Sequence, residues 1–90
     1  MDSVDLMDFY VKTVPYMFSE NFELRIVAEY NQLQYRLIKL INYINASFLR
    51  DADEKILKAQ HKAMTEYRDA LWHRILDLGI DHAYRGELII

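Results

Sequence analysis

The sequence predicts an all-α protein: an antiparallel hairpin of two long helices, preceded by a short helix and assembled into a homo-oligomer. Two observations lead to this fold class. The 90 residues contain only two Gly and one Pro, which leaves few places for tight turns. Apolar residues also recur three and four positions apart over two long stretches, as on one face of an α-helix. The length predicts a single domain, residues 1–90.

The three predicted helices and the tail that follows them span residues 3–14, about 20–47, about 52–78, and 79–90. Pro15 should end the first helix, because the residue before a proline is disfavoured in the α region. Ser19 is a predicted N-cap for the second helix, and Asp51 or Asp53 for the third. Gly79 is placed to end the third helix in a left-handed conformation.

Each long helix carries an apolar seam with steps of three and four residues, a heptad-like pattern. The first seam is Phe22, Ile26, Tyr30, Leu33, Leu37, Leu40 and Ile44. The second is Leu57, Gln60, Met64, Tyr67, Leu71, Ile75 and Leu78. Further apolar residues flank the first seam, so that helix should have more than one neighbour: Leu24, Val27, Ile38, Ile41 and Phe48.

A hairpin of two helices leaves open faces, and we expect self-association to cover them. The tail ends in three apolar residues, Leu88 to Ile90. These residues should dock on an apolar surface, which could belong to a neighbouring subunit.

Several function classes are excluded by composition. The chain has no Cys, so it forms neither a disulfide framework nor a thiol nucleophile. No apolar run is long enough to span a membrane, and the acidic N-terminus does not resemble a signal peptide. We therefore expect an intracellular protein.

Nothing in the sequence indicates an enzyme, a cofactor or a metal. There is no phosphate-binding loop, dinucleotide fingerprint or nucleophile elbow. Asp69, His73 and Asp77 share one helix face, but such a group on a solvated face is more often engaged in local ion pairs.

Charge is distributed unevenly, although the net charge is only −3. Residues 1–23 carry five acidic and one basic side chain, residues 24–50 one acidic and four basic, and residues 51–90 eight acidic and six basic. The middle segment is therefore net basic, by +3. That is too little for duplex nucleic acid, but it suits a small ligand with two or three phosphates.

A polar stripe runs beside the first apolar seam: Arg25, Glu29, Gln32, Arg36 and Lys39. One interpretation is that these residues make interhelical ion pairs, each worth less than about 1 kcal/mol when exposed. The other is a ligand pocket between helices. In that case Arg25, Arg36, Lys39 and Arg74 would hold phosphates, and Gln32 and Gln60 would read base edges. Tyr16, Tyr67 and Trp72 would stack on bases.

The two long helices resemble a family of small phage and prophage proteins grouped with a crAss-like phage protein. The residues that carry the resemblance are Asn21-Phe22, Arg25, Ala28-Glu29-Tyr30, Gln32-Leu33, Arg36, Lys39-Leu40, Gln60, Ala63-Met64, Tyr67, Leu71, Arg74 and Gly79-Ile80. They cover roughly residues 15–80. The chain departs from the family pattern in its connector, where residues 45–53 contain no proline, and in its longer tail.

In architecture, this family is similar to the small helical sponges with which phages capture the cyclic nucleotide signals of bacterial immunity (CBASS, Thoeris). The resemblance implies an oligomer in the host cytoplasm that binds a cyclic di- or trinucleotide, or a signal of the cyclic ADP-ribose type, without catalysis. The alternative is a small phage inhibitor or adaptor. In that case the acidic N-terminal segment and the apolar tail would bind a host or defence protein.

Overall fold

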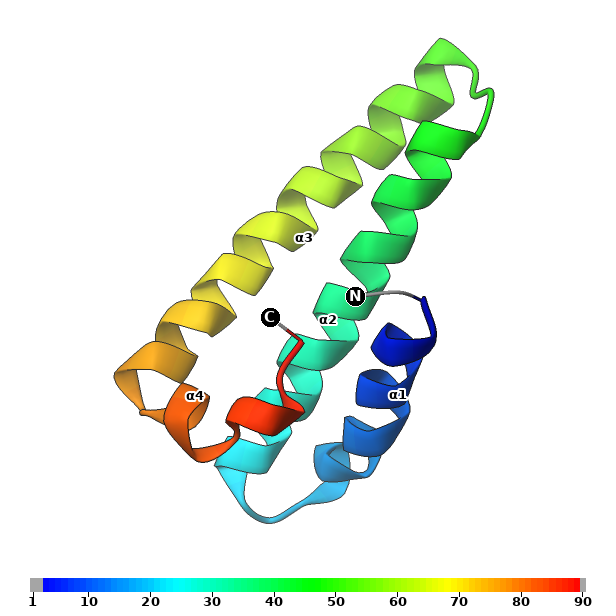
Figure 1. Ribbon diagram of the computed structural model, residues 1–90. Coiled ribbons are helices and arrows are strands. Elements are labelled where there is room, and N and C mark those ends of the chain that lie inside the picture. Colours follow the sequence, from blue (N-terminus) through cyan, green and yellow to red (C-terminus); the bar gives the residue numbers. More distant parts are fainter. Residues whose placement is uncertain (1–2, 90) are drawn as a thin grey trace.

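The computed structural model describes residues 3–89, and side chains from Met7 onward. Within that range the structure is helical, and the helices are joined by short connections (Figure 1). The elements are α1 (Ser3–Thr13), η1 (Val14–Phe18), α2 (Phe22–Ala46), α3 (Asp51–Asp77), α4 (Ile80–Ala83) and η2 (Arg85–Glu87). The all-α prediction is confirmed, with a short N-terminal helix and two long helices.

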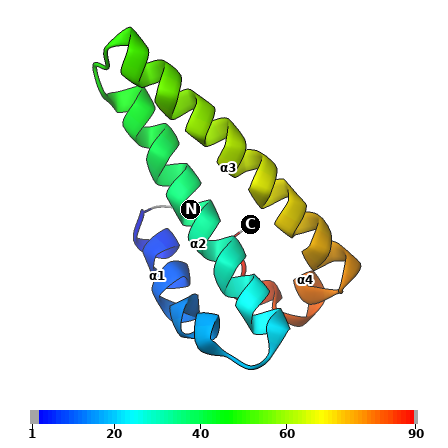
Figure 2. The same cartoon turned by 180° about the vertical axis from the view of Figure 1, so that it is seen from behind.

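Helices α2 and α3 form an antiparallel hairpin joined by residues 47–50, and α1 packs on the side of α2 away from α3 (Figures 1 and 2). The tail, residues 79–89, turns back over α2 on the face toward the viewer in Figure 1. The far end of the hairpin projects beyond both α1 and the tail, and the molecule measures 43 × 26 × 21 Å. One part of the hairpin is therefore covered by α1 and the tail, whereas its tip is covered by neither.

The helix ends differ from the predictions in detail. The N-cap of α2 is Asn21 rather than Ser19, and its side chain accepts a hydrogen bond from the backbone N–H of Glu23. The N-cap of α3 is Arg50, so Asp51 and Asp53 lie in the first turn, where negative charge favours the helix dipole. Gly79 ends α3 as predicted, with φ +70°, a conformation that glycine adopts without strain.

The α-helix α1 ends at Thr13, just before Pro15 and within one residue of the predicted end. After Thr13 the chain tightens into the 3-10 helix η1, and Pro15 occupies its first turn. A proline is tolerated there because the missing N–H would have no partner inside the helix. The 3-10 helix η1 continues to Phe18, beyond the predicted end of the first helix.

The core lies where α2, α3 and the tail meet. It consists of Ile26, Val27, Tyr30, Leu71, Ile75, Ile80 and Leu88, with Tyr16, Leu33, Trp72 and Tyr84 packed against it. The predicted α2 seam is buried at four of its seven positions: Ile26, Tyr30, Leu37 and Ile44.

The seam predicted for α3 is wrong at several positions. Gln60 is exposed, and Tyr67 and Leu78 expose 48% and 46% of their surface. Only Leu71 and Ile75 of that seam are fully buried. Helix α3 has only one long neighbour in the described chain. It therefore buries a narrower apolar stripe than a helix packed between two neighbours would bury.

The described part of the C-terminal tail docks on its own chain. Leu88 and Ile89 expose only 3% and 1% of their surface, while Ile90 lies outside the described residues. The Asn31 carboxamide nitrogen donates to the backbone oxygen of Glu87 at 2.6 Å, and its oxygen accepts from the backbone N–H of Ile89 at 2.9 Å. The same nitrogen donates to the Thr13 hydroxyl at 3.1 Å. One fully buried side chain thus ties α1, α2 and the tail together.

Candidate functional site

Helical register gathers most of the predicted ligand-binding residues on one face of the hairpin. Residues three, four or seven positions apart lie on the same side of a helix. The predicted positions that share this side are Arg25, Gln32, Arg36 and Lys39 of α2 and Gln60, Tyr67 and Arg74 of α3. Together with Glu29 we call these residues the polar face. Its α2 residues face η1 and α3, because Arg25, Glu29 and Gln32 line a pocket with Met17, and Tyr67 contacts Glu29.

A contact between Glu29 and Tyr67 fixes how the two halves of the polar face align, because the Tyr67 hydroxyl donates to the Glu29 carboxylate. In an antiparallel pair, moving seven residues forward on α2 corresponds to moving seven back on α3. Arg36 therefore lies at the level of Gln60, and Arg74 lies at the level of Phe22 in the first turn of α2. The polar face is consequently shared between the helices along most of the hairpin.

A pocket of about 350 Å³ opens at the lower end of the polar face, lined by Met17, Arg25, Glu29 and Gln32. Two hydrogen bonds shape it. The Arg25 guanidinium donates to the backbone oxygen of Ser19 at 2.7 Å, and the Gln32 amide nitrogen lies 3.6 Å from the Met17 sulfur. Element η1 thus supplies one wall, and α2 supplies the charged and polar groups.

Two cations continue the polar face toward the tip. Arg36 and Lys39 are both exposed, and the Lys39 ammonium lies 5.1 Å from the centre of the Tyr35 ring. Tyr35 itself stacks on Tyr10 of α1 at 4.8 Å between ring centres. Among the residues whose side chains the structure describes, no carboxylate forms an ion pair with Arg36 or Lys39. These two cations are available to an anionic ligand.

Two of the predicted stacking residues, Tyr16 and Trp72, lie on the opposite side of the hairpin with the tail. The Tyr16 hydroxyl donates to the Glu87 carboxylate at 2.6 Å. This hydrogen bond, together with partial burial and the nearby negative charge, raises the pKa of Tyr16. Trp72 packs on Tyr30 at 5.5 Å between ring centres and borders a hollow with Asp81, His82 and Arg85. The structure does not bring Tyr16 and Trp72 to the polar face.

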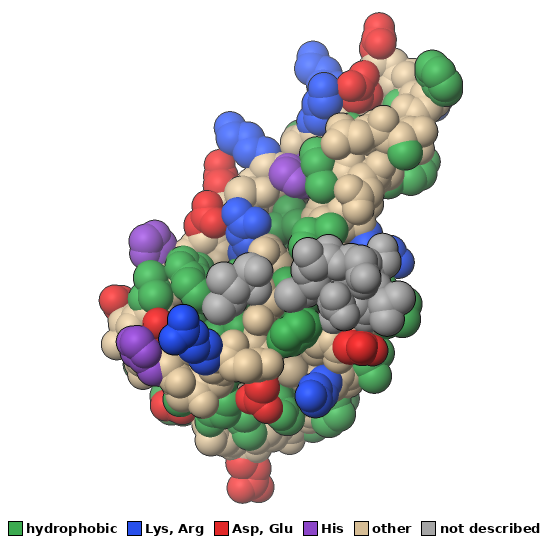
Figure 3. Space-filling model, viewed as in Figure 1, with side chains coloured by type: hydrophobic (Ala, Val, Ile, Leu, Met, Phe, Trp, Pro, Cys, Tyr) green, Lys and Arg blue, Asp and Glu red, His purple; other side chains and the backbone are tan. Residues whose placement is uncertain are grey.

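Figure 3 shows the tail side of the molecule, where acidic, basic and His side chains alternate along the outer edge of α3. Arg36 and Lys39 differ, because they form no ion pair with any described side chain. Asp69, one of the residues weighed as metal ligands, pairs there with Arg68 at 3.1 Å. In the described part of the chain, no cluster of three or more His, Asp or Glu residues is arranged to hold a metal ion.

Sequence reasoning missed two residues of the lower pocket, Met17 and Glu29. Glu29 belonged to the polar stripe, but its negative charge set it apart from residues chosen to bind phosphate. Its spacing of four from Arg25 and three from Gln32 was the available signal. Met17 gave no signal, because its position depends on how η1 folds back on α2.

Of the helices described, none is both long and apolar enough to cross a membrane. Comparison with curated proteins and with solved structures gives no match. One family model, described as Sequestin, matches residues 20–77, which include all of α2 and α3 and therefore every residue of the polar face. The family name denotes sequestration, that is, binding of a ligand rather than its conversion. Because the match covers more than half of its length, the chain belongs to the Sequestin family.

Proposed function

We propose that this protein binds and sequesters a cyclic nucleotide immune signal on the polar face, as a phage anti-defence protein in the infected cell. The ligand would be a cyclic di- or trinucleotide or a signal of the cyclic ADP-ribose type. The observation that carries the proposal is the run of Arg25, Arg36 and Lys39 along one helix face, beside a pocket of about 350 Å³. The family match covers this same part of the chain.

The chemistry of the polar face suits a ligand that is both anionic and rich in hydroxyl and amide edges. Arginine presents a planar fork of donors that matches two phosphate oxygens, and lysine adds a mobile point charge. The Glu29 carboxylate accepts hydrogen bonds only, so it suits ribose hydroxyls or amino groups rather than phosphate. A purely phosphate-binding surface would not place a carboxylate between its cations.

Sequestration needs tight binding and no chemistry. Tight binding usually requires that most of the ligand surface is buried, whereas the polar face is open to solvent along α2. A second copy of the chain facing this side would supply the missing wall. We therefore expect the binding form to be a homo-oligomer.

Calorimetric titration with a panel of cyclic dinucleotides, cyclic trinucleotides and cyclic ADP-ribose isomers tests the proposal. We expect one of them to bind with at least micromolar affinity, and the double variant Arg36→Ala/Lys39→Ala to weaken binding more than about tenfold. Lys62→Ala is the matched control, because Lys62 is an exposed cation of α3 that lies off the polar face. Absence of heat with every member of the panel would refute the proposal.

The alternative proposal, an inhibitor or adaptor that binds a host or defence protein, retains the acidic N-terminal segment as a candidate surface. It loses the apolar tail, because Leu88 and Ile89 are buried against the chain's own helices. Affinity purification from defence-bearing cells separates the two proposals: a stoichiometric protein partner supports the alternative, and a retained nucleotide supports sequestration.

A further inference from the structure

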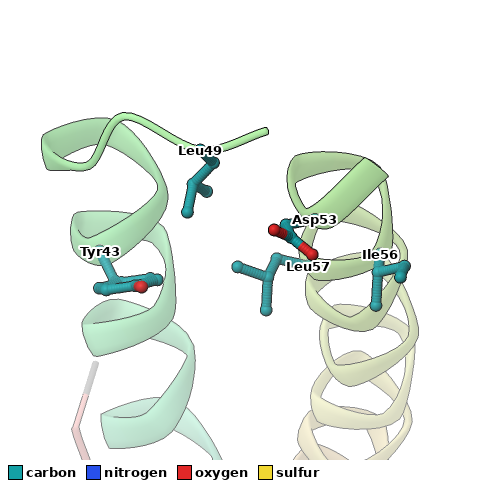
Figure 4. A pocket seen from close by; sticks show the side chains of 5 residues that line it. All are labelled: Tyr43, Leu49, Asp53, Ile56 and Leu57. Carbon is teal, nitrogen blue, oxygen red and sulfur yellow. The ribbon is translucent and has the colours of Figure 1, made fainter. Parts of the chain in front are cut away.

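The polar face ends, at the tip of the hairpin, in a pocket of about 300 Å³ that none of the predicted site residues lines. Figure 4 shows its walls: Tyr43 from α2, Leu49 from the connector, and Asp53, Ile56 and Leu57 from α3. We call this the tip pocket. Its volume is at the lower end of the roughly 300–1,000 Å³ that small-molecule sites occupy.

The tip pocket is continuous with the cations of the polar face. Tyr43 follows Lys39 by four residues and Arg36 by seven, so all three side chains share one side of α2. At 1.5 Å per residue, the rise along the helix from Tyr43 is about 6 Å to Lys39 and about 10 Å to Arg36. These separations match the reach from a nucleobase across its sugar to a phosphate.

The chemistry of the tip pocket is that of a base-binding site. Tyr43 exposes 54% of its surface, which leaves area for stacking, and Leu49 and Leu57 are half-buried apolar walls. Planar bases stack well on such aromatic and apolar surfaces. These walls offer a phosphate no hydrogen-bond donor, whereas they offer a planar ring a surface for stacking.

Asp53 adds a preference for one kind of base edge. One of its carboxylate oxygens accepts from the Arg50 guanidinium at 2.8 Å, and the other remains for a ligand. An ionised carboxylate has no hydrogen to donate, so the ligand edge at this position must donate. Amino groups of adenine and guanine provide such donors.

We propose that the tip pocket binds a purine base with a hydrogen-bond-donating edge, adenine or guanine, while Arg36 and Lys39 bind the phosphate joined to it. This inference rests on the proposed function and names the part of the ligand that the hairpin tip recognises. Tyr43 supplies the stacking face, and Asp53 selects the donor edge.

The test maps simple probes by ¹⁵N–¹H NMR of the full chain. Adenosine 5′-monophosphate at millimolar concentration should shift the backbone amides of Tyr43, Leu49 and Leu57. Ribose 5-phosphate, which has no base, should shift only the amides around Arg36 and Lys39. Purine riboside 5′-monophosphate has no donor on its base, and we expect it to bind about tenfold more weakly than the adenosine probe, as for the loss of one hydrogen bond to a charged group.

Variants then separate the roles of the two residues. Asp53→Asn should remove the preference for the adenosine probe over the purine riboside probe, whereas Asp51→Asn should keep it. Both residues lie in the first turn of α3, and both substitutions remove one negative charge. Tyr43→Ala should weaken both base-bearing probes and leave ribose 5-phosphate unaffected. Tyr43 is exposed, so the variant should fold like the wild type, and the circular dichroism spectrum checks this.

The inference is overturned if the adenosine probe leaves the tip amides unmoved, or if Asp53→Asn and Asp51→Asn behave alike. Tip amides that respond to protein concentration but not to nucleotide would instead mark the tip as a contact between copies, and would also overturn it. These outcomes are distinct from failure of the proposed function. If a cyclic nucleotide binds but the tip does not respond, sequestration stands and the base lies elsewhere. If the tip binds the adenosine probe but no cyclic ligand binds, the pocket stands and sequestration fails.

Discussion

Replacing Asn31 with alanine should release the C-terminal tail from α2. Asn31 is completely buried, and its carboxamide makes three hydrogen bonds, to Thr13, to the backbone oxygen of Glu87 and to the backbone N–H of Ile89. Alanine at this position would leave the two backbone groups of the tail without these partners. The tail then loses its only described polar anchor on α2, although Leu88 and Ile89 still favour burial.

The cost follows from these three contacts. A hydrogen bond contributes about 1 kcal/mol net, and a buried group left unpaired costs more, about 1–3 kcal/mol. Alanine offsets part of this loss, by about 0.5 kcal/mol, because it favours the helix more than asparagine does. We therefore expect Asn31→Ala to lower the free energy of unfolding by about 3 kcal/mol. That is a large part of the roughly 5–10 kcal/mol expected for a domain of this size.

Urea unfolding followed by circular dichroism measures this cost, and carboxypeptidase digestion reports release of the tail. Asn45→Ala is the matched control, because Asn45 is exposed on the same helix and should be neutral or slightly stabilising. A loss below about 1 kcal/mol for Asn31→Ala, with a tail that stays resistant to digestion, would refute the view that Asn31 holds the tail.

Three further predictions concern the tail contact, the end of α3 and the core. The raised pKa of Tyr16 means that its contribution to stability is complete below pH 10 and is lost as pH rises through the folded-state pKa. Melting temperature should therefore fall more steeply above pH 10 for the wild type than for Tyr16→Phe, and equal slopes would contradict this. Gly79→Ala should cost about 1 kcal/mol in urea unfolding, because φ is +70° there, whereas Gly86→Ala should cost less; equal costs would argue against the left-handed stop. Leu71→Ala should cost roughly 2–5 kcal/mol and Leu76→Ala much less, since they expose 2% and 46% of their surface; similar midpoint shifts would contradict the assigned core.

The two long helices could be predicted within about two residues because their ends carry strong local signals. The left-handed Gly79 and the apolar periodicity of α2 act through the local chain alone. The cap of α2 was less predictable, because Ser19 and Asn21 are both good caps and the path of the incoming chain decides between them. In the structure, both act: the Ser19 hydroxyl accepts from the backbone N–H of Asn21, and Asn21 caps the helix.

The sequence contains one indication of where the tail docks, the polar residue Asn31, and the sequence-based prediction did not use it. Asn31 lies between Val27 and Ile38, two of the apolar residues that flank the first seam, at a position where an apolar residue would continue the pattern. A polar residue at such a position indicates a buried hydrogen-bonding role. Its partners are 18 to 58 residues away in the sequence, so no local pattern could have named them.

The candidate site was predictable to the extent that helical register determines it. Arg25, Arg36 and Lys39 share a side of α2 by spacing alone. Tyr16 and Trp72 were expected at the same site, but the fold of η1 and the returning tail hold them on the other side, against Glu87 and Tyr30. The tip pocket depends on how the connector carries Leu49 over the ends of α2 and α3, a tertiary feature without a sequence signature.

Native mass spectrometry with the cyclic nucleotide panel tests ligand binding on the polar face, because it reports bound ligand and the number of subunits together. We expect an oligomer of the 10.8 kDa chain that retains a cyclic nucleotide. The ligand should be lost on denaturation, be absent from Arg36→Ala/Lys39→Ala and be kept by Lys62→Ala. A ligand-free mass with every nucleotide, or equal retention by the double variant and the wild type, would contradict binding on the polar face.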